Sequence, residues 1–205
     1  MSLTIHPILK ESFAIIDREI GEHNFNPQEY AIVRRAIHST ADFEFAKLLK
    51  FSPTAIERAI AALKKGTAIV TDVTMVKQGI SSTIAQTFQN PLISAVEAAS
   101  VPLPGKTRTE TGLLQVAREH PEAIFAIGNA PTALLALCSL IRDSSVKPII
   151  VIAAPVGFVS VVESKAVLAQ TPIPQIRVEG RKGGSPVTAA IINALVTLAW
   201  ETINN

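Results

Sequence analysis

The sequence predicts an α/β protein, a three-layer α/β/α sandwich with a mainly parallel sheet and a helical N-terminal segment. Two observations predict this architecture. The first third of the chain carries apolar residues at three- and four-residue spacing, which is the period of an amphipathic helix. Further along, short β-branched apolar runs alternate with helical patterns, as is typical of βαβ units. No fixed repeat and no linker-like segment interrupts the pattern, so we expect residues 1–205 to form a single domain.

Three helices are expected in the N-terminal third. The first runs from Pro7 to Gly21, where a glycine suits the end of a helix. The second begins at Asn26-Pro27, because asparagine caps helices and proline fits their first turn, and it should reach about Ala41. The third is opened by Ser52-Pro53 and should end before Gly66.

The rest of the chain should supply the sheet and the helices that cover it. The candidate strands are residues 68–71, 92–96, 124–127, 148–154 and 175–178. The candidate helices are residues 109–120, 131–143, 159–169 and 186–200. Residues 149–154 are apolar without alternation, so helices should cover both faces of that strand.

Composition excludes several classes of protein. With 48% hydrophobic residues and a net charge of +2, the chain is too apolar and too weakly charged to be disordered. Two excess charges spread over the chain do not make the basic patch of a nucleic-acid binder. The longest apolar run is about fifteen residues, shorter than a membrane span, and no signal-peptide pattern is visible. We therefore expect a cytoplasmic protein with no nucleic-acid or membrane partner. The lone Cys138 and four scattered histidines predict no metal site.

The segments that follow the predicted strands are rich in glycine, proline and polar residues. In an open parallel sheet, ligands bind beyond the carboxyl ends of the strands, so these segments are candidate binding loops. Asn129 follows the third candidate strand. The segment 180–185 carries three glycines together with Arg181 and Lys182, and Ser185 suits the cap of the final helix, whose N-terminal amides favour an anion. A basic surface loop before a capped helix is the alternative interpretation.

A Gly-Lys-Thr triplet at residues 105–107 indicates no nucleotide site. The phosphate-binding loop needs a glycine five residues earlier, where this chain has Ser100, and Pro102 and Pro104 remove backbone donors. Arg108 is the more informative residue, because it lies between a strand and a helix start, where a guanidinium reaches a carboxylate in the crevice. A solvated arginine is the alternative.

His38 is the candidate proton donor. It follows Arg34 by four residues and Arg35 by three, so a helix places both guanidinium groups on or near its face. Positive charge is thereby gathered beside a titratable acid, and we expect His38 to donate a proton when an anionic ligand is bound. A histidine at the end of an ordinary surface helix is the alternative.

Several segments together resemble the precorrin-8X methylmutase family. In chain order they are Arg35-Ala36-Ile37-His38, Gly128-Asn129-Ala130-Pro131-Thr132-Ala133-Leu134, Pro155-Val156-Gly157-Phe158-Val159, Glu163-Ser164-Lys165 and Gly180-Arg181-Lys182-Gly183-Gly184-Ser185. Shorter matches are Ser12-Phe13-Ala14-Ile15-Ile16, Met75-Val76 with Gly79, and Thr107-Arg108. The resemblance covers about Pro7 to Trp200.

The resemblance implies an isomerase of corrin (cobalamin) biosynthesis. Members move a methyl group from C-11 to C-12 of precorrin-8X or cobalt-precorrin-8, giving hydrogenobyrinic acid or cobyrinic acid, and they are homodimers without a cofactor. His38 falls on the family's catalytic histidine. The implied substrate-binding residues are Ser12, Arg35, Arg108, Ser81, Asn129, Lys165 and Arg181, with Ser82 and Thr83 as alternatives to Ser81. A corrinoid- or tetrapyrrole-binding carrier without activity is the alternative function.

Overall fold

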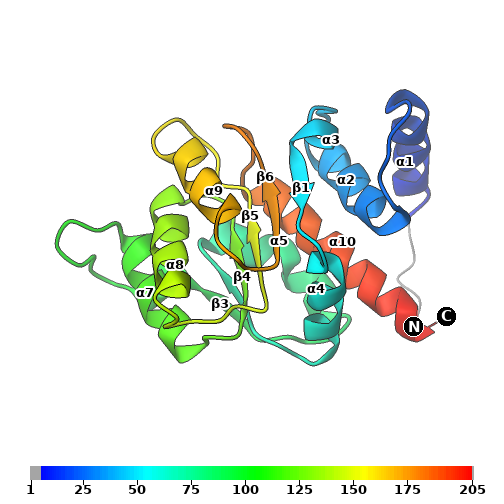
Figure 1. Ribbon diagram of the computed structural model, residues 1–205. Coiled ribbons are helices and arrows are strands. Elements are labelled where there is room, and N and C mark those ends of the chain that lie inside the picture. Colours follow the sequence, from blue (N-terminus) through cyan, green and yellow to red (C-terminus); the bar gives the residue numbers. More distant parts are fainter. Residues whose placement is uncertain (1–5, 205) are drawn as a thin grey trace.

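The computed structural model describes residues 6–204 and confirms the α/β sandwich with its helical N-terminal segment (Figure 1). The middle layer is a six-stranded sheet of order β1-β6-β5-β4-β2-β3. Its strands are β1 (Leu49–Phe51), β2 (Ile69–Thr71), β3 (Leu92–Ser94), β4 (Ile124–Ile127), β5 (Ile150–Ala153) and β6 (Gln175–Val178). All neighbours pair in parallel except the edge strand β1, which is antiparallel to β6.

Helices cover both faces of this sheet (Figure 1). One face carries α2 (Pro27–Thr40), α4 (Ala55–Lys64), α5 (Thr74–Ala85) and α10 (Ser185–Asn204), and the other carries α7 (Arg108–Glu119), α8 (Pro131–Arg142) and α9 (Val161–Ala169). Outside these layers, α1 (Pro7–Glu19) packs on α2. The chain also forms two helices of a single turn, α3 (Phe45–Leu48) and α6 (Ala95–Ala98).

The covered faces explain why the central strands are apolar without alternation. In β4, Ile124 and Ala126 join the core beneath α10, while Phe125 and Ile127 join the core beneath α8. All four residues are buried. Successive residues of a strand point to opposite faces, so a strand with helices on both sides needs an apolar residue at every position.

Helix α2, which carries His38, is defined at both ends by local chemistry. The Asn26 side chain accepts hydrogen bonds from the N–H groups of Gln28 (3.0 Å) and Glu29 (2.9 Å). The Glu29 carboxylate accepts the Asn26 N–H in return, at 3.1 Å, which completes a capping box. The helix ends before Ala41, whose backbone is left-handed with φ 54°. The predicted start and end of this helix are confirmed.

Some elements differ from the sequence-based expectation. β1 was not predicted, because three residues at a sheet edge are too short to show a period. α5 was also not predicted, because Gly79 and polar neighbours obscure its four-residue apolar spacing. The strand expected at 92–96 ends at Ser94, where α6 begins, and the strand expected at 148–154 covers only Ile150–Ala153. α4 begins at Ala55, after the left-handed Thr54 (φ 61°).

Within residues 6–204, one helix is long and apolar enough to cross a membrane by length and composition. It is the part of α10 from Ser185 to Ile203, and 56% of its apolar window is buried inside the protein. α10 packs against α2, α4 and α5. Its hydropathy is therefore explained by its place in the core of the sandwich.

Candidate active site

The carboxyl ends of the parallel strands meet at one edge of the sheet, which we call the rim: residues 72–76, 128–132, 155–160 and 180–184 (Figure 1). The strand order reverses between β2 and β4, because the chain passes outward from β2 to β3 and then crosses back to β4. Such a reversal opens a crevice where ligands of α/β sheets bind.

Asp72 organises the rim at this reversal. Its carboxylate is fully buried and accepts four backbone N–H groups. Oδ1 accepts from Val73 and Gly128, both at 2.9 Å, and Oδ2 accepts from Asn129 and Ala130, both at 2.7 Å. Burial raises the pKa of Asp72, while the four N–H donors oppose that rise because they stabilise the carboxylate. Asp72 thus fixes the loop that presents Asn129.

Asn129 and Arg108 are brought to the same part of the rim. The Asn129 side chain is exposed above the loop held by Asp72. Arg108 is the first residue of α7, after Thr107, whose hydroxyl caps the helix by accepting the Glu110 N–H at 3.1 Å. The Thr107 hydroxyl also lies 3.0 Å from the hydroxyl of Thr132. This contact ties the start of α7, and with it the exposed Arg108, to the loop of Asn129.

The glycine-rich loop, residues 180–184, is fixed to the sheet by close backbone contacts. The Gly184 N–H donates to the Ala154 carbonyl at 2.7 Å. Gly183 has φ 152°, and a Cβ at this position would lie 2.2 Å from the Ala154 carbonyl oxygen. Only glycine fits such an approach without backbone movement. Of the three glycines predicted here as a close-approach loop, Gly183 and Gly184 seat the loop on the end of β5, whereas Gly180 has no atom within 4 Å of where its Cβ would be.

Lys165 lies beneath this loop and points into the protein. Its side chain is 2% exposed, and Nζ donates to the carbonyls of Gly180 and Lys182, each at 2.8 Å. Burial lowers its pKa to about 8. A buried ammonium needs acceptors, and these two carbonyls supply them at neutral pH.

The lowered pKa of Lys165 predicts a rise of stability with pH. Between about pH 8 and 10.5, the unfolded chain keeps a proton on Lys165 that the folded chain has released, so the free energy of unfolding increases. We expect this contribution to be about 3 kcal/mol across the window. Denaturant unfolding at several pH values should show this rise in the free energy of unfolding for the wild type and not for Lys165→Met. The same pH dependence of the free energy in both proteins would contradict the prediction.

The other side chains of the loop point outward. The guanidinium of Arg181 lies over the ring of Phe158, 5.7 Å from its centre, and both residues are exposed. Lys182 pairs with Asp42 and Glu44, with both N–O distances at 2.6 Å. These two acids follow α2 directly, so Lys182 connects the rim to the end of the helix that carries His38.

His38 lies near the end of α2 and is exposed. Its ring meets Phe13 of α1 edge to face, with the ring centres 5.6 Å apart. Beside it is a hollow of about 450 Å³ between α1 and α2. The hollow is lined by Ser12, Ile15, Ile16, Glu19, Ile37, His38, Ala41 and Phe43. The Ser12 hydroxyl lines it while donating to the Ile8 carbonyl at 2.9 Å. His38 and Ser12 are therefore brought together in a largely apolar hollow.

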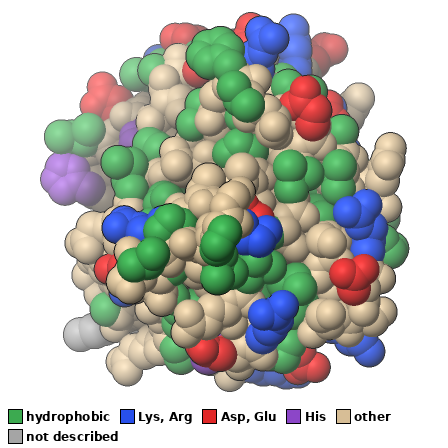
Figure 2. Space-filling model, turned by 90° about the vertical axis from the view of Figure 1, so that its left-hand side faces the viewer, with side chains coloured by type: hydrophobic (Ala, Val, Ile, Leu, Met, Phe, Trp, Pro, Cys, Tyr) green, Lys and Arg blue, Asp and Glu red, His purple; other side chains and the backbone are tan. Residues whose placement is uncertain are grey.

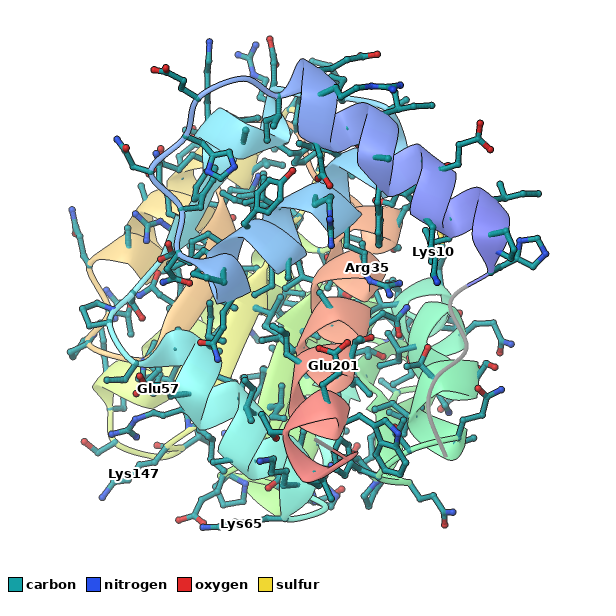
Figure 3. All side chains as sticks on the ribbon, turned by 90° about the vertical axis from the view of Figure 1, so that its right-hand side faces the viewer. Lys10, Arg35, Glu57, Lys65, Lys147 and Glu201 are labelled. Carbon is teal, nitrogen blue, oxygen red and sulfur yellow. The ribbon has the colours of Figure 1, made fainter. Side chains whose placement is uncertain are left out.

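The two arginines that precede His38 have other partners. Arg34 contacts Phe13, as His38 does, but its guanidinium forms an ion pair with Asp17 at 3.0 Å. Arg35 points from α2 toward α10 and Glu201 (Figure 3). Burial and the charge of Arg34 lower the pKa of Arg35, while Glu201 opposes this. The expectation that both guanidinium groups gather beside His38 is wrong for Arg35, which lines a separate cavity of about 100 Å³.

Ser81 lies on α5, away from the strand ends. Its hydroxyl is partly buried and donates to the Gln78 carbonyl at 3.0 Å. Its neighbour Ser82 is exposed and accepts from the Gln86 side chain at 3.3 Å, and Thr83 is partly buried.

Comparison with known proteins identifies the family of the chain. Residues 7–198 match the family model described as precorrin-8X methylmutase. The chain belongs to this family. The precorrin-8X methylmutases are isomerases of cobalamin biosynthesis, and this chain is a methylmutase. The match covers nearly the whole range, Pro7 to Trp200, over which the sequence resembles the family.

Individual precorrin-8X methylmutase relatives are similar to this chain over nearly their full length. The chain is 54% identical to the cobalt-precorrin-8 methylmutase of Synechocystis sp., over 96% of this chain and 97% of the relative. It is 36% identical to the precorrin-8X methylmutase of Sinorhizobium sp., over 92% of each chain. The crystal structure of precorrin-8X methyl mutase from Thermus thermophilus superposes with a TM-score of 0.87 at 40% identity, covering 96% of this chain and 99% of that one.

Some residues that shape the candidate site were missed as candidates in the sequence. Asp72 was not among the candidates, yet it holds the Asn129 loop by contacts 56 to 58 positions away along the chain. Its position directly after a buried strand is the one signal that pointed to it. Asp42 and Glu44 carry no signal of their own, because they act through Lys182.

Proposed function

We propose that this methylmutase converts cobalt-precorrin-8 to cobyrinic acid by moving a methyl group from C-11 to C-12, with His38 as proton donor and without a cofactor. The observation that carries the proposal is the position of His38, exposed beside an apolar hollow in a chain of this family. The cobalt-containing substrate is favoured by the names of the relatives from Synechocystis sp. and Priestia megaterium, at 54% and 41% identity. The Sinorhizobium sp. relative, named for precorrin-8X, is 36% identical.

The chemistry explains the need for an acid. Protonation of the conjugated ring withdraws electrons from the carbon that receives the methyl group, which eases a [1,5]-sigmatropic shift. The bond from the methyl carbon to C-11 breaks as its bond to C-12 forms. The proton later leaves the ring, because substrate and product are isomers. An imidazole is suited to this exchange near neutral pH.

The substrate carries acetate and propionate carboxylates around its ring, which arginines bind with both charge and direction. We assign these contacts to Arg108 and Arg181, which are exposed at the rim, together with Asn129. Ser12 is assigned to the edge of the ring near His38. Ser81 and Arg35 stay predicted contacts. The carboxylates would reach Arg35 through the cavity of about 100 Å³ that lies between α1, α2 and α10.

An absorbance time course tests the function. The protein is mixed separately with cobalt-precorrin-8 and with metal-free precorrin-8X. Methyl migration alters the conjugated chromophore, so we expect a progressive spectral change at catalytic amounts of protein with the cobalt substrate. Change with the metal-free substrate alone would reassign the substrate. A small, static shift with both that scales with protein concentration would favour a carrier without activity.

Arg108→Ala is expected to weaken substrate binding about tenfold, because one charge-assisted hydrogen bond is lost. Titration of the chromophore gives the dissociation constant. Arg118→Ala is the matched control, since Arg118 is an exposed arginine in the last turn of the same helix. An unchanged dissociation constant in Arg108→Ala removes it from the substrate contacts.

We also propose that the protein acts as a homodimer in the cytoplasm. Large apolar side chains are exposed around the rim and on the loop before α7, where Figure 2 shows them among lysines and arginines. They are Met75, Val101, Leu103, Val156, Phe158 and Val159. Exposed apolar groups gathered in this way favour a protein interface. Sedimentation should give a mass near twice the chain mass of 21.9 kDa, and a single-chain mass would contradict the dimer.

A further inference from the structure

Lys165 donates to the two carbonyls that flank Arg181 in the chain. The acceptors are Gly180 and Lys182, so the ammonium bridges the backbone on both sides of the arginine. The carbonyl between them, of Arg181 itself, accepts the Gly157 N–H at 3.2 Å. Three successive carbonyls of the glycine-rich loop therefore have donors on the protein side. With its carbonyls held in this way, the loop presents the side chain of Arg181 outward.

The same loop joins two parts of the site. Its far end is seated on β5 by the Gly184 N–H and by Gly183, and Lys182 reaches Asp42 and Glu44 at the end of α2. The ion pairs of Lys182 are solvent-exposed and therefore weak in themselves. Their geometry is kept only if the Lys182 backbone is fixed, and the Lys182 carbonyl is one of the two that Lys165 holds.

From these contacts we propose that Lys165 is a positioning residue: it fixes the backbone of residues 180–182 so that Arg181 is held ready for a substrate carboxylate, and it does not contact the substrate itself. The proposal rests on the proposed function, in which Arg181 binds substrate. It also reassigns Lys165, which the resemblance implies as a direct contact. An ammonium that is 2% exposed and bonded to two carbonyls has little capacity left for an external anion.

A double-mutant cycle distinguishes positioning from contact. Lys165→Met and Arg181→Ala are each expected to raise the dissociation constant of the substrate about tenfold, and the double variant is expected to stay near the same tenfold, because Lys165 acts through Arg181. If Lys165 contacts substrate independently, the double variant weakens binding about a hundredfold, and the proposal is overturned. Lys147→Met is the control, since Lys147 is exposed and points away from the body of the protein (Figure 3).

Amide hydrogen exchange tests the same role without substrate. Removing the ammonium should speed exchange of the Gly157 and Gly184 N–H groups at least tenfold in Lys165→Met, while Lys147→Met matches the wild type. Equal exchange in all three proteins overturns the proposal. The exchange measurement needs no corrin, so it tests the role of Lys165 even if the proposed function is wrong. A failure of the positioning role and a failure of the proposed function are therefore distinguishable.

The wild-type protein supplies a test if Lys165→Met does not fold. In a structure of the wild type with bound corrin, Nζ of Lys165 should stay on the carbonyls of Gly180 and Lys182, and a substrate carboxylate should lie on Arg181. Movement of Nζ onto a substrate carboxylate contradicts the positioning role.

Discussion

Replacing His38 with alanine is expected to lower turnover at least about a hundredfold, because the variant has no acid to protonate the corrin ring. The fold should survive. The imidazole is exposed, and its ring contact is the edge-to-face approach to Phe13, which is worth about 1 kcal/mol. Substrate affinity should change little, because the proposed carboxylate contacts lie elsewhere. Initial rates, substrate titration and an unfolding curve measure these three quantities.

His23→Ala is the matched control for this variant. His23 lies in the connection before α2 and stacks on Tyr30, with ring centres 4.4 Å apart, so the same substitution removes a ring contact outside the hollow of His38. We expect its turnover to match the wild type. Near-normal turnover in His38→Ala would remove His38 as proton donor, even if the protein proved to be an active methylmutase.

The second large effect is expected from Asp72→Asn, which replaces a carboxylate by a group of the same size. The two oxygens of Asp72 accept four backbone N–H groups, from Val73, Gly128, Asn129 and Ala130. An amide offers one carbonyl oxygen, and its NH2 would face two N–H donors. Two buried donors left unsatisfied cost about 3 kcal/mol or more.

Denaturant unfolding measures this loss, and Asp143→Asn is the control. Asp143 is exposed at the end of α8, so its variant should stay within about 0.5 kcal/mol of the wild type. Turnover of Asp72→Asn should fall as well, because the loop of Asn129 loses its anchor. A variant as stable as the wild type would show that the four contacts contribute little to the fold.

The sequence predicted the parts of the site that depend on local pattern. α2 and its ends follow from Asn26, Pro27 and a four-residue apolar period, so His38 could be placed on a helix beforehand. The alternation of strand and helix patterns also predicted a parallel sheet, so the loops that carry Asn129 and Arg181 could be expected at one edge of it. Local rules suffice for these features because each is fixed by residues within a few positions.

The remaining features depend on packing between distant segments. Arg35 is three residues from His38, but its side chain enters the space beside α10, which no local rule reveals. In the sequence, Lys165 is one polar residue of a predicted helix. Its ammonium is buried because α9 packs against the glycine-rich loop, whose carbonyls accept its hydrogen bonds. Asp72 is likewise an ordinary acidic residue after a strand in the sequence, and its role follows only from its contacts with the distant loop after β4.

A methylmutase moves a methyl group within the corrin and does not only bind it. The most direct measurement is 13C NMR of the corrin after incubation with the protein, using cobalt-precorrin-8 labelled with 13C both in the methyl group on C-11 and at C-12. We expect the methyl signal to be replaced by one coupled to C-12, at unchanged molecular mass and with many turnovers per chain. A labelled methyl that stays on C-11 while the corrin remains bound to the protein would contradict it.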